Sequence, residues 1–260
     1  MINVIIPAYN CTKTLDKTLS SLVAQTDSEF HVILVDDCST EDIKSIVDTY
    51  ADKLTINYIR NEKNLGCGMS RQVGIDNADC THFTFLDSDD MFMPYAVETF
   101  NSIVKANPDT EFIHSYFYEQ KTINGNPALI LHERNYDLCH GKLYNKKLID
   151  KFGIKNSPLV KYADDSFFNS MCTELLDAQV IGIPTVLWCN NPNSVIRRHN
   201  PERDLILKED FLNAMKMSRN FVLQFKDSVT HMERTIQRFI KNNSLNDKEA
   251  QLLENLKERK

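Results

Sequence analysis

The sequence lacks an apolar run that approaches the roughly 20 residues needed for a membrane-spanning helix. It also lacks a basic region at its start, and the stretch Met1–Tyr9 is too short for a signal peptide. We therefore expect a cytoplasmic protein that contacts a membrane, if at all, only peripherally.

The sequence has no C-x-x-C pair, although it contains seven cysteines at scattered spacing. This pattern predicts neither a zinc site nor a disulfide framework, and it favours reduced thiols. An excess of basic residues is absent too, because the net charge is −6, so no global positive field indicates nucleic-acid binding. The hydrophobic content of 42% is typical of a soluble globular protein.

The first half of the chain alternates apolar runs with amphipathic segments. Four apolar runs predict β-strands over Ile2–Ala8, Phe30–Val35, Leu54–Ile59 and Thr81–Leu86. Capping residues and apolar spacing predict helices over Thr12–Ala24, Ser39–Ala51, Gly68–Asn77 and Pro94–Lys105. Strands this apolar are buried on both faces, which indicates an α/β fold with a parallel sheet between helices.

The pattern changes after Glu111. Further strands are predicted over Glu111–Tyr118, Ala128–Glu133 and Gln179–Trp188, and helices over Lys146–Phe152 and Asp164–Leu176. They are typical of a mixed-sheet extension. From Pro201 the chain is charged and has no further glycine or proline, which predicts a helical C-terminal extension over 201–260.

Polar residues follow three of the predicted strands. They are Pro7-Ala8-Tyr9-Asn10, then Asp36-Asp37-Cys38-Ser39, then Asp87-Ser88-Asp89-Asp90. Because ligands of open α/β sheets bind at the carboxyl ends of strands, the three groups should converge on one crevice. Clustered carboxylates repel one another unless a cation lies among them, so Asp87 and Asp89 indicate a divalent metal and a bound phosphate. An Asp-rich turn that caps the next helix is the structural alternative.

Five motifs in order resemble those of the family 2 glycosyltransferases: PAYN, VDDCSTED, NLGCGMSRQVGID, FLDSDD and YADDSFFN. The resemblance covers about Ile2–Arg198. It implies the GT-A fold, a Rossmann-like mixed sheet flanked by helices, and inverting transfer of a sugar from a nucleotide-sugar donor. It also implies a domain over 1–200, with a nucleotide-binding half at 1–110 and an acceptor half at 111–200.

The resemblance implies roles for the donor-binding residues. Pro7, Ala8 and Tyr9 would line the base pocket, where Tyr9 offers an aromatic face. Asp36 and Asp37 would follow them, and Asp37 would accept a hydrogen bond from the uracil imide, which makes UDP the expected nucleotide and leaves dTDP open. Arg71 would reach the nucleotide.

The metal roles come from the same resemblance. Asp87, Ser88 and Asp89 would hold the ribose and a Mn²⁺ or Mg²⁺ that neutralises the leaving diphosphate. His199 would be a further metal ligand or a surface histidine, and Arg197 and Arg198 would face the diphosphate.

Asp164 and Asp165 stand where the family has a Glu-Asp pair. The resemblance makes Asp165 the general base that takes the proton of the acceptor hydroxyl. Because Asp164 stands where the family has Glu, either carboxylate could be the base. Adjacent carboxylates raise one another's pKa, which suits a base near neutral pH. A double N-cap before a helix at Ser166–Met171 is the structural alternative.

The acceptor and the function class stay open at this point. A glycan or lipid-linked glycan is the expected acceptor for such a family member. Basic residues at helical spacing near the C-terminus, Arg234, Arg238 and Lys241, would allow a DNA acceptor with a hydroxylated base, which would have to be flipped out. Two different classes of protein would also account for the carboxylates: a metal-dependent phosphotransferase with Asp87 as nucleophile, and a non-catalytic nucleotide-sugar-binding domain.

Overall fold

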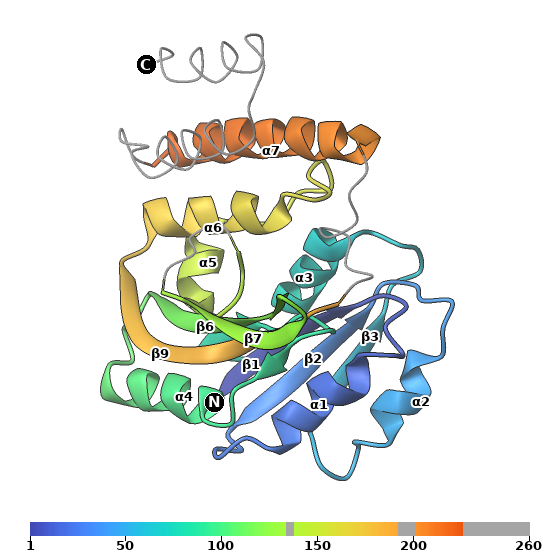
Figure 1. Cartoon of the computed structure of the whole chain (residues 1–260). Helices are drawn as coiled ribbons and strands as arrows, with labels where there is room; N and C mark the ends of the chain where they lie inside the picture. Colours follow the sequence, from blue (N-terminus) through green and yellow to red (C-terminus); the bar gives the residue numbers. More distant parts are fainter. Residues whose placement is uncertain (134–137, 192–200, 226–260) are drawn as a thin grey trace.

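The protein is described by a computed structural model that covers residues 1–133, 138–191 and 201–225 (Figure 1). The predicted donor-site residues Arg197 and Arg198, the predicted metal ligand His199, and the basic residues near the C-terminus lie outside these ranges.

The first half forms the predicted parallel sheet. Its strands are β1 (Ile2–Ala8), β2 (Phe30–Asp36), β3 (Ile56–Arg60) and β4 (His82–Phe85). β1 pairs in parallel with β2 and β4, and β2 pairs in parallel with β3. The central strand β1 is buried throughout, as its apolar run predicts, whereas the edge strand β3 is partly exposed.

Helices cover both faces of the sheet (Figure 1). On one face, α1 (Leu15–Val23), α2 (Ile43–Asp48) and α4 (Ala96–Ala106) share a hydrophobic cluster with β1 and β2. On the other face, α3 (Cys67–Asp76), α5 (Lys146–Phe152) and α6 (Asp164–Leu175) share a second cluster. This is the predicted α/β sandwich.

The helix predicted over Ser39–Ala51 is shorter than expected, because α2 begins at Ile43. Its N-cap is Asp42, whose carboxylate accepts a hydrogen bond from the Ser45 amide at 3.1 Å. Ser39 instead accepts from the Asn10 amide through its hydroxyl at 3.0 Å. The segment before α2 therefore ties the end of β2 to the end of β1 rather than opening the helix.

The second half extends the sheet as a mixed one. Its strands are β5 (Met91–Phe92), β6 (Phe112–Ile123), β7 (Asn126–His132), β8 (Lys142–Asn145) and β9 (Ala178–Trp188). Among the described residues the sheet has nine strands in the order β3-β2-β1-β4-β8-β6-β9-β5, with β7 paired to β6. β6, β7 and β9 confirm the predicted strands. β5 and β8 were missed, because two to four residues carry too little periodicity.

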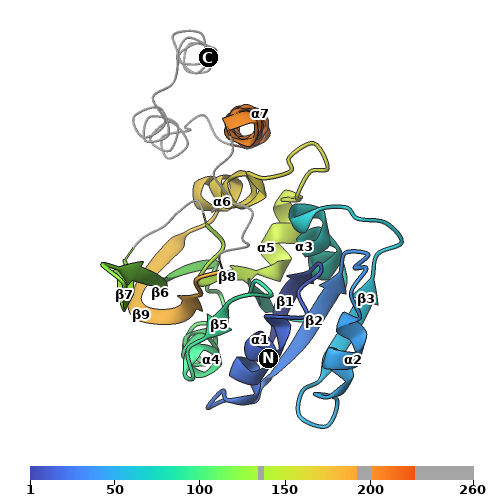
Figure 2. The same cartoon turned by 45° about the vertical axis from the view of Figure 1, so that its right-hand side comes forward.

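The first part of the C-terminal region is the helix α7 (Pro201–Val222), which packs on α6 as an outer layer (Figure 2). Its residues Phe211, Met215 and Val222 are buried in the same cluster as α3 and α6. This part of the predicted helical extension is confirmed, and it is continuous with the main core. The division of the chain at residue 200 stays a prediction.

Across the described residues, no helix is long and apolar enough to cross a membrane. The cytoplasmic location stays a prediction.

Candidate active site

The carboxyl ends of β1 and β2 meet at the predicted base pocket. The amide of Asp37 donates to the Ala8 carbonyl at 2.8 Å, which holds the two strand ends together. Tyr9 follows with 50% of its surface exposed, while Ala8 is buried. An exposed aromatic residue at the end of β1 can offer its face to a planar base.

Asp37 organises the loop before α3. Its carboxylate accepts from the amides of Leu65 and Gly66 and from the Asn61 side chain, each at 2.8 Å. These contacts saturate much of its acceptor capacity and fix the loop that leads to α3. Asn61 is a residue whose role the sequence did not indicate.

Asp36 points away from Asp37, toward the edge strand. Its buried carboxylate accepts from the Tyr58 hydroxyl at 2.6 Å, pairs with Arg60, and accepts from the Ser39 amide at 2.8 Å. Burial works to raise the pKa of Asp36, but the hydrogen bonds from Tyr58 and Ser39 outweigh it and lower that pKa. The hydrogen bonds of Asp36 in this structure tie the end of β2 to β3 and to Ser39. Its donor-binding role stays a prediction.

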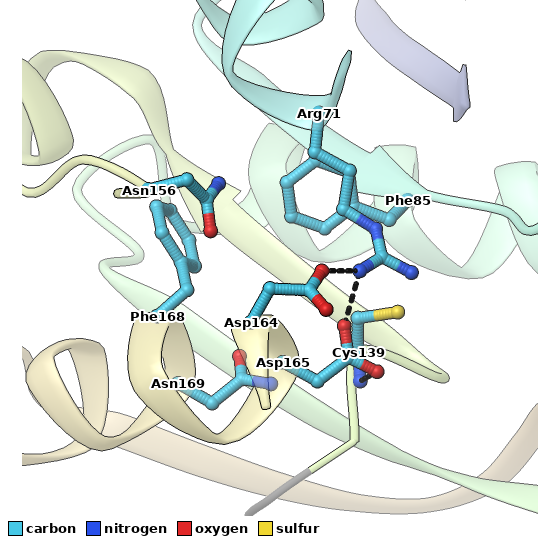
Figure 3. Close-up of a pocket in the computed structure, with 8 residues that line it drawn as sticks. All are labelled: Arg71, Phe85, Cys139, Asn156, Asp164, Asp165, Phe168 and Asn169. Carbon is cyan, nitrogen blue, oxygen red and sulfur yellow. Dashed lines mark hydrogen bonds and ion pairs between the residues drawn. The ribbon is translucent and has the colours of Figure 1, made fainter. Parts of the chain in front are cut away.

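Arg71 is the centre of the site (Figure 3). It projects from α3 toward the first turn of α6, where its guanidinium pairs with both Asp164 and Asp165. Its other terminal nitrogen donates to Asp87 at 2.6 Å. Arg71 is 4% exposed and lies over the Phe85 ring at 5.6 Å. One buried cation thus joins the carboxylate at the end of β4 to the pair at the start of α6.

The three carboxylates around Arg71 differ in their electrostatics. Burial raises the pKa of Asp164 to about 7, and the neighbouring charges of Asp165 and Asp87 add to this. Burial acts in the same direction on Asp87, but the Arg71 guanidinium outweighs it and lowers the pKa of Asp87. Asp165 is more exposed than Asp164, at 19% against 9% of the side chain, and also faces the Cys139 amide at 3.4 Å.

A second group lies at the end of β4. His140 contacts Asp90 through its Nε2 at 2.8 Å, and ligand atoms of Asp87, Asp90 and His140 all lie within 4.8 Å of one another. Asp89 accepts instead from the Asn191 side chain at 2.8 Å. The sequence did not indicate His140, because the fold alone brings it beside residues about 50 positions away.

Burial and charge also perturb this group. Burial raises the pKa of Asp90 to about 6, although His140 acts against that rise. Burial works to lower the pKa of His140, but the hydrogen bond and charge of Asp90 outweigh it and raise that pKa. Burial and the charge of Asp87 raise the pKa of Asp89.

The residues present fit a divalent cation. His140 is buried, and its Nδ1 has no hydrogen-bond partner within the described part of the chain. One imidazole and two carboxylates make a donor set suited to Mn²⁺. This set shares Asp87 with the predicted metal site, has His140 where the prediction had His199, and leaves Asp89 next to the group.

The chain belongs to the glycosyl transferase family 2, whose family model matches residues 3–168. The match ends within α6, just after Asp164 and Asp165.

Its sequence relatives share part of their length with it. An uncharacterised glycosyltransferase of Haemophilus influenzae is 40% identical over 114 residues, 44% of this chain and 38% of that protein. The poly(ribitol-phosphate) beta-N-acetylglucosaminyltransferase TarS of Staphylococcus aureus is 40% identical over 91 residues, 34% of this chain and 16% of TarS. The matched segments span less than half of either relative.

Solved structures share its fold. TarS in complex with UDP-GlcNAc superposes with a TM-score of 0.78 at 21% identity, over 98% of this chain and 79% of that one. A mannosyltransferase from Pyrobaculum calidifontis in complex with GDP-Man and Mn²⁺ gives 0.61 at 13% identity, over 98% and 78%. The predicted GT-A fold is confirmed by this likeness.

Proposed function

We propose that this protein is a glycosyltransferase that moves a sugar from a UDP-sugar to an acceptor hydroxyl with inversion at the anomeric carbon. The observation that carries the proposal is the Arg71 network, in which one buried guanidinium contacts Asp87 on the donor side and Asp164 and Asp165 on the other. A donor held at the end of β4 then faces a carboxylate that can act as a base.

The UDP preference is supported from two sides. The end of β2 at Asp37 is hydrogen-bonded to the end of β1, which Tyr9 directly follows, and TarS, which has the same fold, is solved with UDP and with UDP-GlcNAc.

Asp165 is the proposed general base. It is the more exposed member of the pair, so an acceptor hydroxyl can reach it, and its pairing with Arg71 fixes the carboxylate. Asp165 takes the proton of that hydroxyl while the oxygen attacks the anomeric carbon and the bond to UDP breaks. A single displacement with one base inverts the anomeric configuration. Asp164, whose pKa burial raises to about 7, pairs with Arg71 and serves to position that guanidinium.

Asp87, Asp90 and His140, with Asp89 beside them, are the proposed holders of a Mn²⁺ or Mg²⁺. A bound divalent cation would supply charge neutralisation for the leaving diphosphate. Carboxylates at this edge of the sheet would otherwise repel that diphosphate.

The proposed acceptor is a glycan or a lipid-linked glycan. The support is the similarity to TarS, whose name gives poly(ribitol-phosphate) as what it acts on. Family membership favours a sugar-transferring enzyme over a phosphotransferase and over a non-catalytic nucleotide-sugar-binding domain. No described residue favours the alternative DNA acceptor, because the basic residues that suggested it lie outside the described ranges.

The proposal is tested with Asp165→Asn, which keeps the shape of the side chain and removes its basicity. Transfer of labelled sugar from UDP-GlcNAc to poly(ribitol phosphate) or to lipid-linked glycans should fall by about 10² to 10⁴-fold. UDP affinity, measured by calorimetry with Mn²⁺ present, should stay within about twofold. Ser166→Ala, one position along α6, is the matched control and should keep transfer. Near-normal transfer by Asp165→Asn would contradict the base assignment.

A further inference from the structure

The first turn of α6 lacks a cap from its own segment. Asp164 is the first residue of the helix, and the N-cap position is Ala163, whose side chain cannot accept a hydrogen bond. Amides at the start of a helix have no partner within the helix, and leaving them unpaired where they are buried is costly. The carboxylates that the proposed function depends on therefore lie in a first turn without a side-chain cap, so their positions depend on how the segment before the turn is held.

Asp210 of α7 holds the segment that leads into this turn. Its carboxylate accepts from three successive backbone amides, at 3.0 and 3.1 Å from Lys161, at 2.7 Å from Tyr162 and at 2.9 Å from Ala163. Asp210 is 8% exposed. A buried carboxylate with several amide donors makes strong, short hydrogen bonds, and three neighbouring amides fix the path of the backbone as one side chain on a single amide cannot.

The helix α7, which carries Asp210, is itself packed into the core. The next residues on α7, Phe211 and Leu212, and Met215 one turn later, are buried in the core shared with α6. Figure 2 shows α7 lying on α6, on the side away from the sheet. α7 lies beyond residue 168, where the family match ends. The side chain that binds the amides of residues 161–163 thus comes from a part of this chain that the family model does not match.

We propose that Asp210 is a positioning residue for the transfer reaction: by holding the amides of Lys161, Tyr162 and Ala163 from α7, it aims Asp164 and Asp165 at Arg71. The inference rests on the proposed function, in which Asp165 is the base. Within the described part of the chain, the hydrogen bonds of Asp210 go to residues 161–163 and not to Arg71, so its effect passes through the backbone of this segment.

The positioning role predicts a separation between binding and turnover. The donor residues Tyr9, Asp37 and Asp87 follow the ends of β1, β2 and β4, whereas the hydrogen bonds of Asp210 hold the segment before α6. Loss of the Asp210 contacts should therefore lower kcat and leave the donor KM unchanged. A misplacement of the base by about 1 Å can cost about 100-fold in rate.

The test uses the full chain with Asp210→Asn, Asp210→Ala and the control Glu209→Gln, which removes a neighbouring charge on an exposed face of α7. Asp210→Asn is nearly isosteric, but its amide group opposes backbone N–H donors with donors of its own. Both Asp210 variants should lower kcat at least about tenfold, with donor KM and UDP affinity within about twofold. Amide exchange at residues 161–165 should quicken in both and stay unchanged in Glu209→Gln.

The outcomes separate the two hypotheses. If the Asp210 variants exchange faster at 161–165 but keep the wild-type kcat, Asp210 is only a structural anchor and the positioning role is overturned. Unchanged exchange overturns it as well. If wild type binds UDP and transfers sugar while the variants do the same, the Asp210 inference alone fails. A wild-type chain that neither binds UDP nor transfers sugar contradicts the proposed function itself and the positioning role with it.

The variants also need a check on folding, because Asp210→Ala leaves three amides unpaired. All rates are therefore measured well below each variant's Tm, and Asp210→Asn provides the result if Asp210→Ala does not fold.

Discussion

Arg71 shows how much one side chain can hold together. Its guanidinium is the cation that contacts Asp87, Asp164 and Asp165, and burial makes each of those charges costly when it is unpaired. A lysine in its place would offer a single ammonium, which cannot span carboxylates from two elements as a planar fork does. The stability of the donor-free protein should therefore depend strongly on this residue.

The change Arg71→Met should lower the free energy of unfolding by about 3–5 kcal/mol near neutral pH, because it leaves buried carboxylates without their cation. Urea unfolding followed by circular dichroism measures it. Lys44→Met is the control, since Lys44 pairs with Asp48 on an exposed face of α2 and should matter by about 0–1 kcal/mol. An Arg71→Met variant as stable as the control would show that the network carries little energy.

Asp164 gives the network a dependence on pH. Its pKa rises on folding from 3.8 to about 7, so the folded protein holds a proton that the unfolded chain has already released. Stability from this group is complete below pH 3.8 and is lost as pH rises through about 7. Asp164→Asn cannot titrate, so its unfolding free energy should fall less across that window. Parallel curves for the two proteins in urea titrations at a series of pH values would contradict the raised pKa.

The sequence was informative about residues that lie in recognisable motifs and uninformative about partners that folding brings in. Arg71, Asp87, Asp164 and Asp165 were all predicted, because each lies in a motif with a recognisable position. His140 and Asp210 carry no local signal. His140 meets Asp90 across 50 positions, and Asp210 meets Ala163 across 47.

At the scale of elements, the approach of α3 to α6 depends on a glycine. A Cβ added to Gly68 would lie 2.6 Å from the Asp164 Cβ and 3.2 Å from its Cγ, which is closer than packed atoms tolerate. The absence of a side chain at Gly68 lets α3 bring Arg71 within reach of both carboxylates. The sequence placed Gly68 at a helix start, but it gave no sign that the glycine serves the close contact of two helices.

Gly68→Ala should therefore move Asp164 or push the two helices apart. The expected cost is about 1–3 kcal/mol of stability together with a fall in transfer rate. Gly182→Ala is a matched control in β9, because its added Cβ meets only ring atoms of Tyr116 at 3.9 Å. Thermal unfolding and initial transfer rates measure the two effects. A Gly68→Ala protein that matches the control in both would show that the helices adjust without cost.

Short elements were the ones that the sequence did not predict. β8 forms because β4 and β6 flank it on either side, so its order comes from pairing rather than from its own four residues. The first turn expected for α2 was lost for a similar reason. The amides of Thr40 and Glu41 donate to the Asn10 side chain, at 2.8 and 3.2 Å, and that contact holds them outside the helix.

At the scale of the whole molecule, the alternation of strands and helices was enough to predict the α/β fold, since continuous apolar runs and the 3.6-residue period of the helices are both clear in the sequence. It was not enough to predict that α7 would share a core with α6. A charged helix with an apolar stripe looks similar whether it extends from the domain or packs on it, and the partner surface decides.

Ligand binding is a property of the whole molecule, because the proposed donor site draws on β1, β2, β4 and the segment that carries His140. A ligand that binds only the folded state stabilises it by mass action, by about 2.7 kcal/mol at 100 times its dissociation constant. UDP-sugars with Mn²⁺ should therefore raise the Tm. dTDP-sugars should raise it too if the hydrogen bond from the base imide to Asp37 determines nucleotide choice, whereas GDP- and CDP-sugars should not.

The metal contributes to the same shift. Chelation of the metal should remove the shift, since the diphosphate would then face Asp87, Asp89 and Asp90 without a cation. A shift of equal size with and without metal would contradict the metal site while leaving the nucleotide site intact. A shift with GDP-sugars alone would contradict the role proposed for Asp37, because guanine would then occupy the pocket beside Tyr9.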